Sequence, residues 1–191
     1  HSKPVMYDYG GEVKTVFVGT NEGYLHAINA NDGTERWAFM PDMLLKNITR
    51  FYENNEMMQH VYGVDGQLRV WANDKNRDGH IVTSEGEGIY LFFGLGRGGS
   101  RYYALDITDP NAPTLKWTIK ETSSGFSELA ETWSKPVLAR MMVQVGNEPQ
   151  LKDVLVFGAG YDLAKDEADY SKRVADKQGR DVYIVDALSG A

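Results

Sequence analysis

The chain has 191 residues, a formal net charge of −7 and no cysteine. This length can bury a substantial core in one or two domains, and the missing cysteines exclude disulfide bonds and thiol nucleophiles. The acidic balance argues against nucleic acid as a partner, because phosphate contacts require clustered lysine and arginine. No apolar run approaches the roughly 20 residues of a membrane-spanning helix, so we expect no membrane-spanning segment.

One pattern of short strands occurs three times along the chain. In each copy an apolar strand ends in glycine, and a second strand follows after a turn. Short antiparallel strands repeated at a period of roughly 60 residues are typical of propeller blades. We therefore predict an all-β fold, a β-propeller with quinoprotein-like, four-stranded blades. The expected blades cover about residues 1–41, 61–120 and 133–191.

Two of the copies continue into a fourth strand that carries a tryptophan, Trp37 or Trp117. Because both hold the same place in the repeat, we expect them to pack between neighbouring blades. The third copy stops at Ala191, where its tryptophan strand is expected to begin. We therefore expect a partial ring of about three blades, which missing blades or a partner chain must close.

Two insertions interrupt the repeat. The first, over about residues 42–58, is rich in methionine and aromatic residues and has partly helical spacing, with Asp42 in a position to cap a helix. We expect one or two helical turns packed on the propeller face. The second, over residues 162–177, is rich in charge, and we expect a solvated, partly helical loop, with an interaction loop as the alternative.

Residues 74–85 have the spacing of a calcium-binding loop. Oxygen-bearing side chains stand at loop positions one, three, five and twelve, and Gly79 stands at position six. The flanking residues 67–72 and 89–93 are typical of strands, so we place the loop in a long β-hairpin and expect Ile81 to tie it to the core. A polar turn that binds nothing is the alternative. The predicted calcium ligands are Asp74, Asn76, Asp78, the backbone carbonyl of His80, and Glu85.

Other motifs carry less weight. Residues 94–99 match G-x-G-x-x-G, but a strand rather than a helix is predicted next, so a hairpin turn is expected instead of a dinucleotide site. The four histidines are scattered without zinc spacing, and no carboxylate pair stands out as an acid and a base. We therefore expect no enzymatic activity.

Several stretches resemble known propeller families. Residues 27–37 (AINANDGTERW) resemble the tryptophan-docking repeat of quinoprotein-type propellers. The C-terminal propeller of the PilC/PilY family of type IV pilus proteins is a closer likeness, in the same order over nearly the whole chain. The matching stretches are VGTNEGYLHA (18–27), ERWAFMP (35–41), HVYGVDG (60–66), YYALDITD (102–109), WSKPV (133–137) and FGAGY (157–161).

The resemblance to the PilC/PilY family implies an exported module of a pilus assembly and adhesion protein. It implies a place at the cell surface or pilus tip, associated with the outer membrane of a Gram-negative bacterium, with pilus components (minor pilins) and a host surface as partners. In members of this family, calcium binding at this loop is associated with pilus extension, retraction and twitching motility.

The resemblance also implies Ca²⁺ as cofactor at Asp74, Asn76 and Asp78. The family's loop often closes with aspartate at position nine, where this chain has Val82, so Glu85 or a water molecule would have to close the site. Two alternative functions stay open. The chain could be a fragment of a pyrroloquinoline-quinone (PQQ)-dependent quinoprotein dehydrogenase, or a calcium-independent propeller scaffold.

Overall fold

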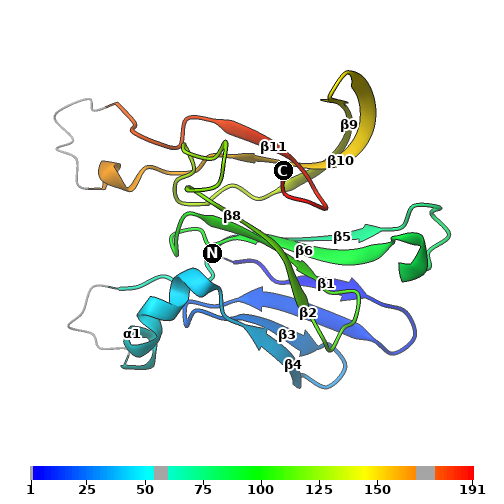
Figure 1. The fold of residues 1–191 in the computed structure, drawn as a ribbon. Helices are drawn as coiled ribbons and strands as arrows, with labels where there is room; N and C mark the ends of the chain where they lie inside the picture. Colours follow the sequence, from blue (N-terminus) through cyan, green and yellow to red (C-terminus); the bar gives the residue numbers. More distant parts are fainter. Residues whose placement is uncertain (1, 54–59, 167–174) are drawn as a thin grey trace.

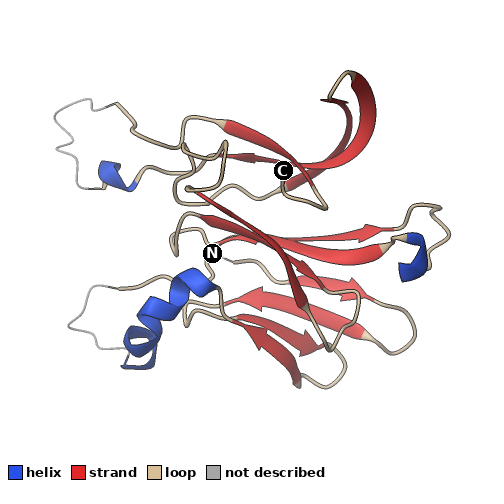
Figure 2. Cartoon of the chain, in the orientation of Figure 1, coloured by secondary structure: helices blue, strands red, loops and turns tan. Residues whose placement is uncertain are grey.

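Three antiparallel β-sheets lie one above another in the computed structural model, which describes residues 2–53, 60–166 and 175–191 (Figure 1). The first and second sheets have four strands each, and the third has three. Most of the described secondary structure is strand (Figure 2), so the predicted all-β class is confirmed. The first sheet has the order β1 (Val5–Asp8), β2 (Lys14–Gly19), β3 (Leu25–Asn29), β4 (Glu35–Phe39).

The second sheet repeats this arrangement, and the third follows it with one strand fewer. The second has the order β5 (Leu68–Asn73), β6 (Gly88–Gly94), β7 (Arg101–Asp106), β8 (Thr114–Lys120). The third has the order β11 (Val182–Asp186), β10 (Glu148–Gly158), β9 (Val137–Val145). Because β6 ends at Gly94 and the antiparallel β7 begins at Arg101, the glycine-rich stretch joins two strands, and the predicted hairpin turn is confirmed.

The second sheet is buried on both faces at its inner strand β6. Every residue of β6 is buried, and its side chains alternate between two cores. Leu91 and Phe93 join the core shared with the first sheet, whereas Tyr90 and Phe92 join the core shared with the third. A strand covered on both faces reads as a continuous apolar run, which explains the sequence pattern at residues 89–93.

The two repeat tryptophans link neighbouring sheets, as predicted. The indole Nε1–H of Trp37 donates to the carbonyl oxygen of Pro110, between the first and second sheets, at 3.1 Å. The indole Nε1–H of Trp117 donates to the carbonyl oxygen of Ala187, between the second and third sheets, at 3.1 Å. Each tryptophan therefore hydrogen-bonds the turn of the following sheet while its ring packs against the shared core.

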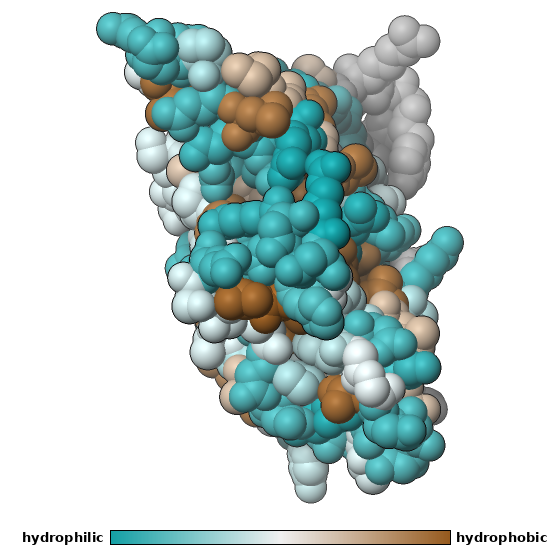
Figure 3. Space-filling model, turned by 90° about the vertical axis from the view of Figure 1, so that its right-hand side faces the viewer, coloured by the Kyte–Doolittle hydropathy of each residue, from teal (hydrophilic) through white to brown (hydrophobic). Residues whose placement is uncertain are grey.

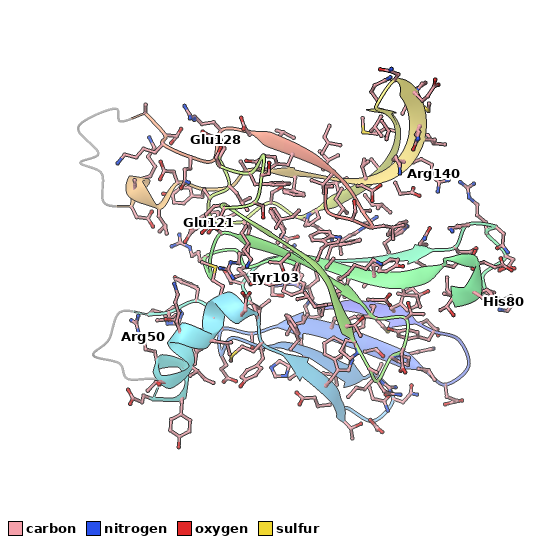
Figure 4. All side chains as sticks on the ribbon, viewed as in Figure 1. Arg50, His80, Tyr103, Glu121, Glu128 and Arg140 are labelled. Atoms are coloured by element: carbon pink, nitrogen blue, oxygen red, sulfur yellow. The ribbon has the colours of Figure 1, made fainter. Side chains whose placement is uncertain are left out.

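The first insertion contains the 3-10 helix η1 (Asp42–Asn47) and the short helix α1 (Ile48–Glu53), and residues 54–58 of the predicted segment lie outside the described residues. The prediction that Asp42 caps a helix is wrong. Pro41 takes the cap position without a side-chain bond, and the Asp42 carboxylate instead accepts hydrogen bonds from Tyr103 at 2.8 Å and Arg101 at 2.6 Å. This carboxylate therefore fastens the insertion to β7, where Figure 4 labels Tyr103.

The second insertion begins with the 3-10 helix η3 (Leu163–Lys165), and residues 167–174 lie outside the described part. No helix in the described residues is both long and apolar enough to cross a membrane. Strand ends and the loops between them meet at the two ends of the stack of sheets, and the candidate calcium loop lies at one of these ends.

Candidate functional site

The candidate calcium loop joins β5 to β6 and projects from one end of the second sheet, where His80 is labelled in Figure 4. Both flanking segments are strands, so the predicted hairpin is confirmed. Ile81 packs against the core shared by the first two sheets, as expected. The loop closes with the 3-10 helix η2 (Thr83–Glu85) before β6 begins. Hydrophilic residues cover much of this end of the molecule, with separate hydrophobic patches (Figure 3).

Asp74 organises the first half of the loop. Its two carboxylate oxygens accept the backbone N–H groups of Arg77 at 2.6 Å and Gly79 at 2.9 Å. These bonds require the chain to turn sharply around the carboxylate, and both donors have positive φ, 60° for Arg77 and 84° for Gly79. Glycine tolerates this conformation at little cost, which gives Gly79 its physical role at position six.

Asn76 and Asp78 continue the same turn. The Asn76 side-chain oxygen accepts the backbone N–H of Asp78 at 3.0 Å, and its Nδ2 donates to the Asp78 carboxylate at 2.9 Å. The other Asp78 oxygen accepts the backbone N–H of His80 at 2.8 Å. The structure thus brings the side chains of loop positions three and five into contact, and the side chain at position one hydrogen-bonds the backbone of the same turn.

Glu87, which the sequence analysis missed, holds the two sides of the loop together. Its side chain is only 4% exposed. One carboxylate oxygen accepts the backbone N–H of Lys75 at 2.8 Å, and the other accepts that of Val82 at 2.9 Å. The calcium-loop spacing ends at position twelve, so it gives no signal for a residue at position fourteen.

Glu85 lies in η2 on the exposed side of the loop. Its backbone carbonyl accepts a hydrogen bond from the Lys75 ammonium at 2.8 Å. Among the described residues, which include the whole loop, no group of three His, Cys, Asp or Glu side chains is arranged to hold a metal ion. The fit to a hard cation therefore depends on the oxygens of Asp74, Asn76 and Asp78, together with the backbone carbonyl of His80.

The loop's own hydrogen bonds leave lone pairs on these oxygens unused. An ionised carboxylate offers about four lone-pair sites, and each loop N–H occupies one of them. The residue types therefore fit Ca²⁺ at positions one, three and five, and Glu85 would have to turn inward to complete the set.

The loop faces the β9–β10 hairpin of the third sheet across a hollow. The hollow has a volume of about 470 Å³, and its walls include Asp74 and Arg77 from the loop and Arg140 and Asp153 from the hairpin. Arg140 and Asp153 form a two-pronged ion pair across the hairpin, at 2.8 and 2.7 Å. The loop and the neighbouring sheet thus share one charged surface, on which Figure 4 labels Arg140.

No family model matches the chain. It is 37% identical over 142 residues to a type IV pilus biogenesis factor PilY1 homologue of Xylella fastidiosa, covering 72% of this chain and 11% of that protein. It is 35% identical over 130 residues to the type IV pilus biogenesis factor PilY1 of Pseudomonas aeruginosa, covering 66% of this chain and 10% of that protein. The chain therefore spans about a tenth of the length of these curated relatives.

A solved structure gives the same answer for the fold. The crystal structure of the Pseudomonas aeruginosa PilY1 C-terminal domain superimposes with a TM-score of 0.59 and 26% identity, covering 94% of this chain and 29% of that one. The three stacked sheets are thus propeller-like in the manner of that domain. The sequence and structure likenesses agree: the chain is a homologue of the C-terminal domain of PilY1.

Proposed function

We propose that the chain is a calcium-binding propeller module of a type IV pilus assembly and adhesion protein, without enzymatic activity. In this proposal the three sheets are consecutive quinoprotein-like blades of a larger ring. The homology to PilY1 supports the pilus role. The inter-sheet hydrogen bonds of Trp37 and Trp117 support the blade arrangement.

One observation carries the calcium part of the proposal. The Asp74 carboxylate accepts the N–H groups of loop positions four and six, which bends the chain so that positions one, three and five lie in one tight turn. Two carboxylates and a carboxamide in one turn are hard-cation ligands. The carboxylates of Asp74 and Asp78 repel each other, and a divalent ion between them removes that repulsion.

The regulatory part of the proposed function rests on the position of the loop. Because the loop borders the β9–β10 hairpin, ion binding would change the charge of a surface that two sheets share. We propose that this surface adjusts contacts with pilus components such as minor pilins during extension and retraction, and with a host surface during attachment. The protein would act outside the cell, at the cell surface or pilus tip of a Gram-negative bacterium.

Calorimetric titration with Ca²⁺, paired with thermal unfolding in Ca²⁺ and in chelator, tests the proposal. Binding to the folded state alone should stabilise the protein by about 2.7 kcal/mol at a hundredfold excess over Kd. Asp74→Asn should abolish the binding heat and the calcium-dependent rise in melting temperature. Asp32→Asn is the matched control, because Asp32 also accepts a turn N–H, that of Thr34 at 2.9 Å, outside the calcium loop.

A second candidate function, a calcium-independent scaffold, is favoured by one specific observation. Asp74, Asp78 and Glu87 already hold the loop through backbone N–H groups, so the loop has a defined shape without an ion. A melting temperature that is equal in Ca²⁺ and chelator, together with absent binding heat, would select this scaffold function. The relatives found are pilus biogenesis factors, which favours the pilus role over a PQQ-dependent dehydrogenase.

Pilus assembly offers a separate test in the organism. A strain carrying Asp74→Asn in the full-length protein should show altered surface piliation and reduced twitching zones, whereas Asp32→Asn should behave like wild type. Normal piliation and twitching in a strain whose purified Asp74→Asn protein no longer binds Ca²⁺ would contradict the regulatory part alone.

A further inference from the structure

A second hollow lies at the other end of β6, away from the calcium loop. It has a volume of about 310 Å³ and is lined by Asp65, Gly66, Gln67, Gly96, Arg97 and Trp133. These residues come from three separate segments: the link before β5, the turn after β6, and the link before β9. The hollow therefore forms only when these three segments come together at the end of the second sheet.

Trp133 forms one wall of this hollow and is unusual in its exposure to solvent. It is 42% exposed, whereas the other three tryptophans, all in the described part of the chain, are buried or half-buried. Despite this exposure its indole is fixed in place. The indole Nε1–H donates to Glu131 at 3.0 Å, and the ring stacks on Tyr161 with 4.7 Å between the ring centroids. An exposed aromatic side chain that is already held rigidly loses little conformational entropy when a ligand contacts it.

Arg97 is also held in a defined orientation. Its guanidinium carbon lies 5.0 Å from the ring centroid of Trp133 and 5.5 Å from that of Tyr62. The planar guanidinium stacks favourably on aromatic rings while its edge keeps several N–H donors. Arg97 therefore supplies a fixed fork of donors at the rim of the hollow.

Asp65 and Gln67 supply the complementary groups. Asp65 is 5% exposed and offers acceptor oxygens only, whereas Gln67 offers both an acceptor and donors. The small hollow beside the Trp133 indole is thus bordered by a side chain that only donates hydrogen bonds, Arg97, one that only accepts them, Asp65, and one that does both, Gln67. A ligand that fills it must present donors and acceptors on neighbouring atoms.

Carboxyl groups outnumber cations around the hollow. Burial raises the pKa of Glu131, although the Trp133 hydrogen bond and the Arg97 charge act in the opposite direction. The Arg97 charge favours the ionised form of Glu131, whereas the carboxyl groups of Asp166 and Asp65 act against it. An anionic ligand would meet these carboxyl groups while losing its hydration, so an anion is disfavoured, whereas an uncharged ligand requires no counter-charge.

We propose that this hollow binds a neutral sugar ring, as a monosaccharide or as the end unit of a glycan. Vicinal hydroxyl groups place donors and acceptors on neighbouring carbons, which matches the groups of Asp65, Gln67 and Arg97. The C–H groups of the ring would contact the Trp133 wall. A volume of about 310 Å³ is at the small end of ligand pockets and accommodates one or two rings. This site is independent of the calcium loop and of its proposed function.

Saturation-transfer NMR of the full chain with methyl glycosides of glucose, galactose, mannose and N-acetylglucosamine tests the proposal, with titration calorimetry on any glycoside that binds. Gln67→Ala and Arg97→Lys should each weaken binding about tenfold, because each removes hydrogen bonds to the sugar. Arg97→Lys keeps the charge but loses the planar fork and its stacking on Trp133 and Tyr62. Gln144→Ala, a glutamine change at the opposite end of the molecule, is the matched control and should leave affinity unchanged.

Several results would overturn the site. The first is that no glycoside binds. The second is that a glycoside binds but Gln67→Ala and Arg97→Lys leave its affinity unchanged. The third is that the zwitterion diglycine binds and no glycoside does. Near-ultraviolet circular dichroism and the melting temperature of each variant show whether it is folded. If Arg97→Lys fails to fold, Gln67→Ala still decides, because Gln67 is partly exposed and belongs to no strand.

Discussion

Glu87 ties the two sides of the candidate calcium loop together through its two carboxylate oxygens. Glu87→Gln replaces one of these acceptors with an amide NH₂ group that faces a backbone N–H. The partly buried donor then loses its partner, which should lower the free energy of unfolding by about 1 kcal/mol without calcium present. Urea unfolding in chelator measures this change.

Glu85→Gln is the matched control for Glu87→Gln, because Glu85 is an exposed glutamate of the same loop. It should change the free energy of unfolding in chelator by less than about 0.5 kcal/mol, as is usual for surface substitutions. If Glu85 closes the proposed calcium site, the same change should lower calcium affinity. Equal stability losses in the two variants would contradict the clamp role of Glu87.

Asp42 provides a prediction about pH. Burial would raise the pKa of its carboxyl, but hydrogen bonds from Tyr103 and Arg101 hold the pKa below its usual range. A carboxyl with a lowered pKa in the folded state contributes stability above its unfolded pKa of about 4, and loses that contribution as pH falls through the folded value. Asp42→Asn should therefore lower the melting temperature by a constant amount at pH 5–8, and the difference from wild type should shrink below about pH 4.

Thermal unfolding of wild type and Asp42→Asn across this pH range measures the effect. Tyr103→Phe removes one of the two donors and should reproduce part of the loss with the same pH dependence. A difference that stays constant down to pH 3 would show that the Asp42 charge does not stabilise the fold.

At the scale of the elements, the contact between Trp117 and the third sheet also gives a reason for glycine at position 190. Gly190 has a φ of 74°, and a Cβ there would lie 3.0 Å from Cδ2 of Trp117. Gly33 has a similar φ of 77° and no atom within 4 Å of such a Cβ. A comparison of substitutions at Gly33 and Gly190 therefore separates the cost of backbone strain from the cost of crowding against the Trp117 indole.

Both Gly33→Ala and Gly190→Ala should lower the free energy of unfolding by about 1–2 kcal/mol, because alanine is strained at positive φ. Gly190→Ala should cost about 1 kcal/mol more, since the added methyl group presses on Trp117. Denaturant unfolding of both variants measures the difference. Equal losses would indicate that the turn of the third sheet moves freely away from the indole.

The sequence predicted these elements because their signals are local. Strand alternation, the glycines that end strands and the position of Trp37 and Trp117 within the repeat can all be read over a few residues. The role of Asp42 could not be read in this way, because its partners Arg101 and Tyr103 are about sixty residues away and meet it only after the sheets stack. The hollow beside Trp133 escaped notice for the same reason, since three separate segments build it.

The candidate calcium site was predicted in part. The spacing identified Asp74, Asn76 and Asp78, and the structure places these three in one turn. It could not identify Glu87, because the need for a carboxylate there arises from two backbone N–H groups that the fold brings together. The closing role of Glu85 and the carbonyl of His80 stay predictions.

At the scale of the whole molecule, the second sheet holds the other two together through opposite faces of one strand. Leu91 belongs to the core shared with the first sheet, and its neighbour Phe92 belongs to the core shared with the third. Leu91→Ala and Phe92→Ala should each lower the free energy of unfolding by about 2–5 kcal/mol. Their local effects should differ, because each weakens a different interface.

Hydrogen exchange of the backbone amides separates the two variants. Leu91→Ala should raise exchange mainly in β2 and β3, whereas Phe92→Ala should raise it mainly in β10 and β11. Each variant is the control for the other. Identical exchange patterns would show that the three sheets open as a single cooperative unit.

The hydrogen bonds of Asp74, Asp78 and Glu87 give the candidate calcium loop a defined shape without an ion, and this has a consequence for the proposed regulation. Because the loop is already folded, a divalent ion that bound there would change the electric field around the loop more than its conformation. The formal charge of the chain would change from −7 to −5, with the whole change concentrated at one tip beside Arg140 and Asp153. A partner that senses this change would respond to ionic strength as strongly as to calcium, because dissolved salt weakens such fields within about 8–10 Å.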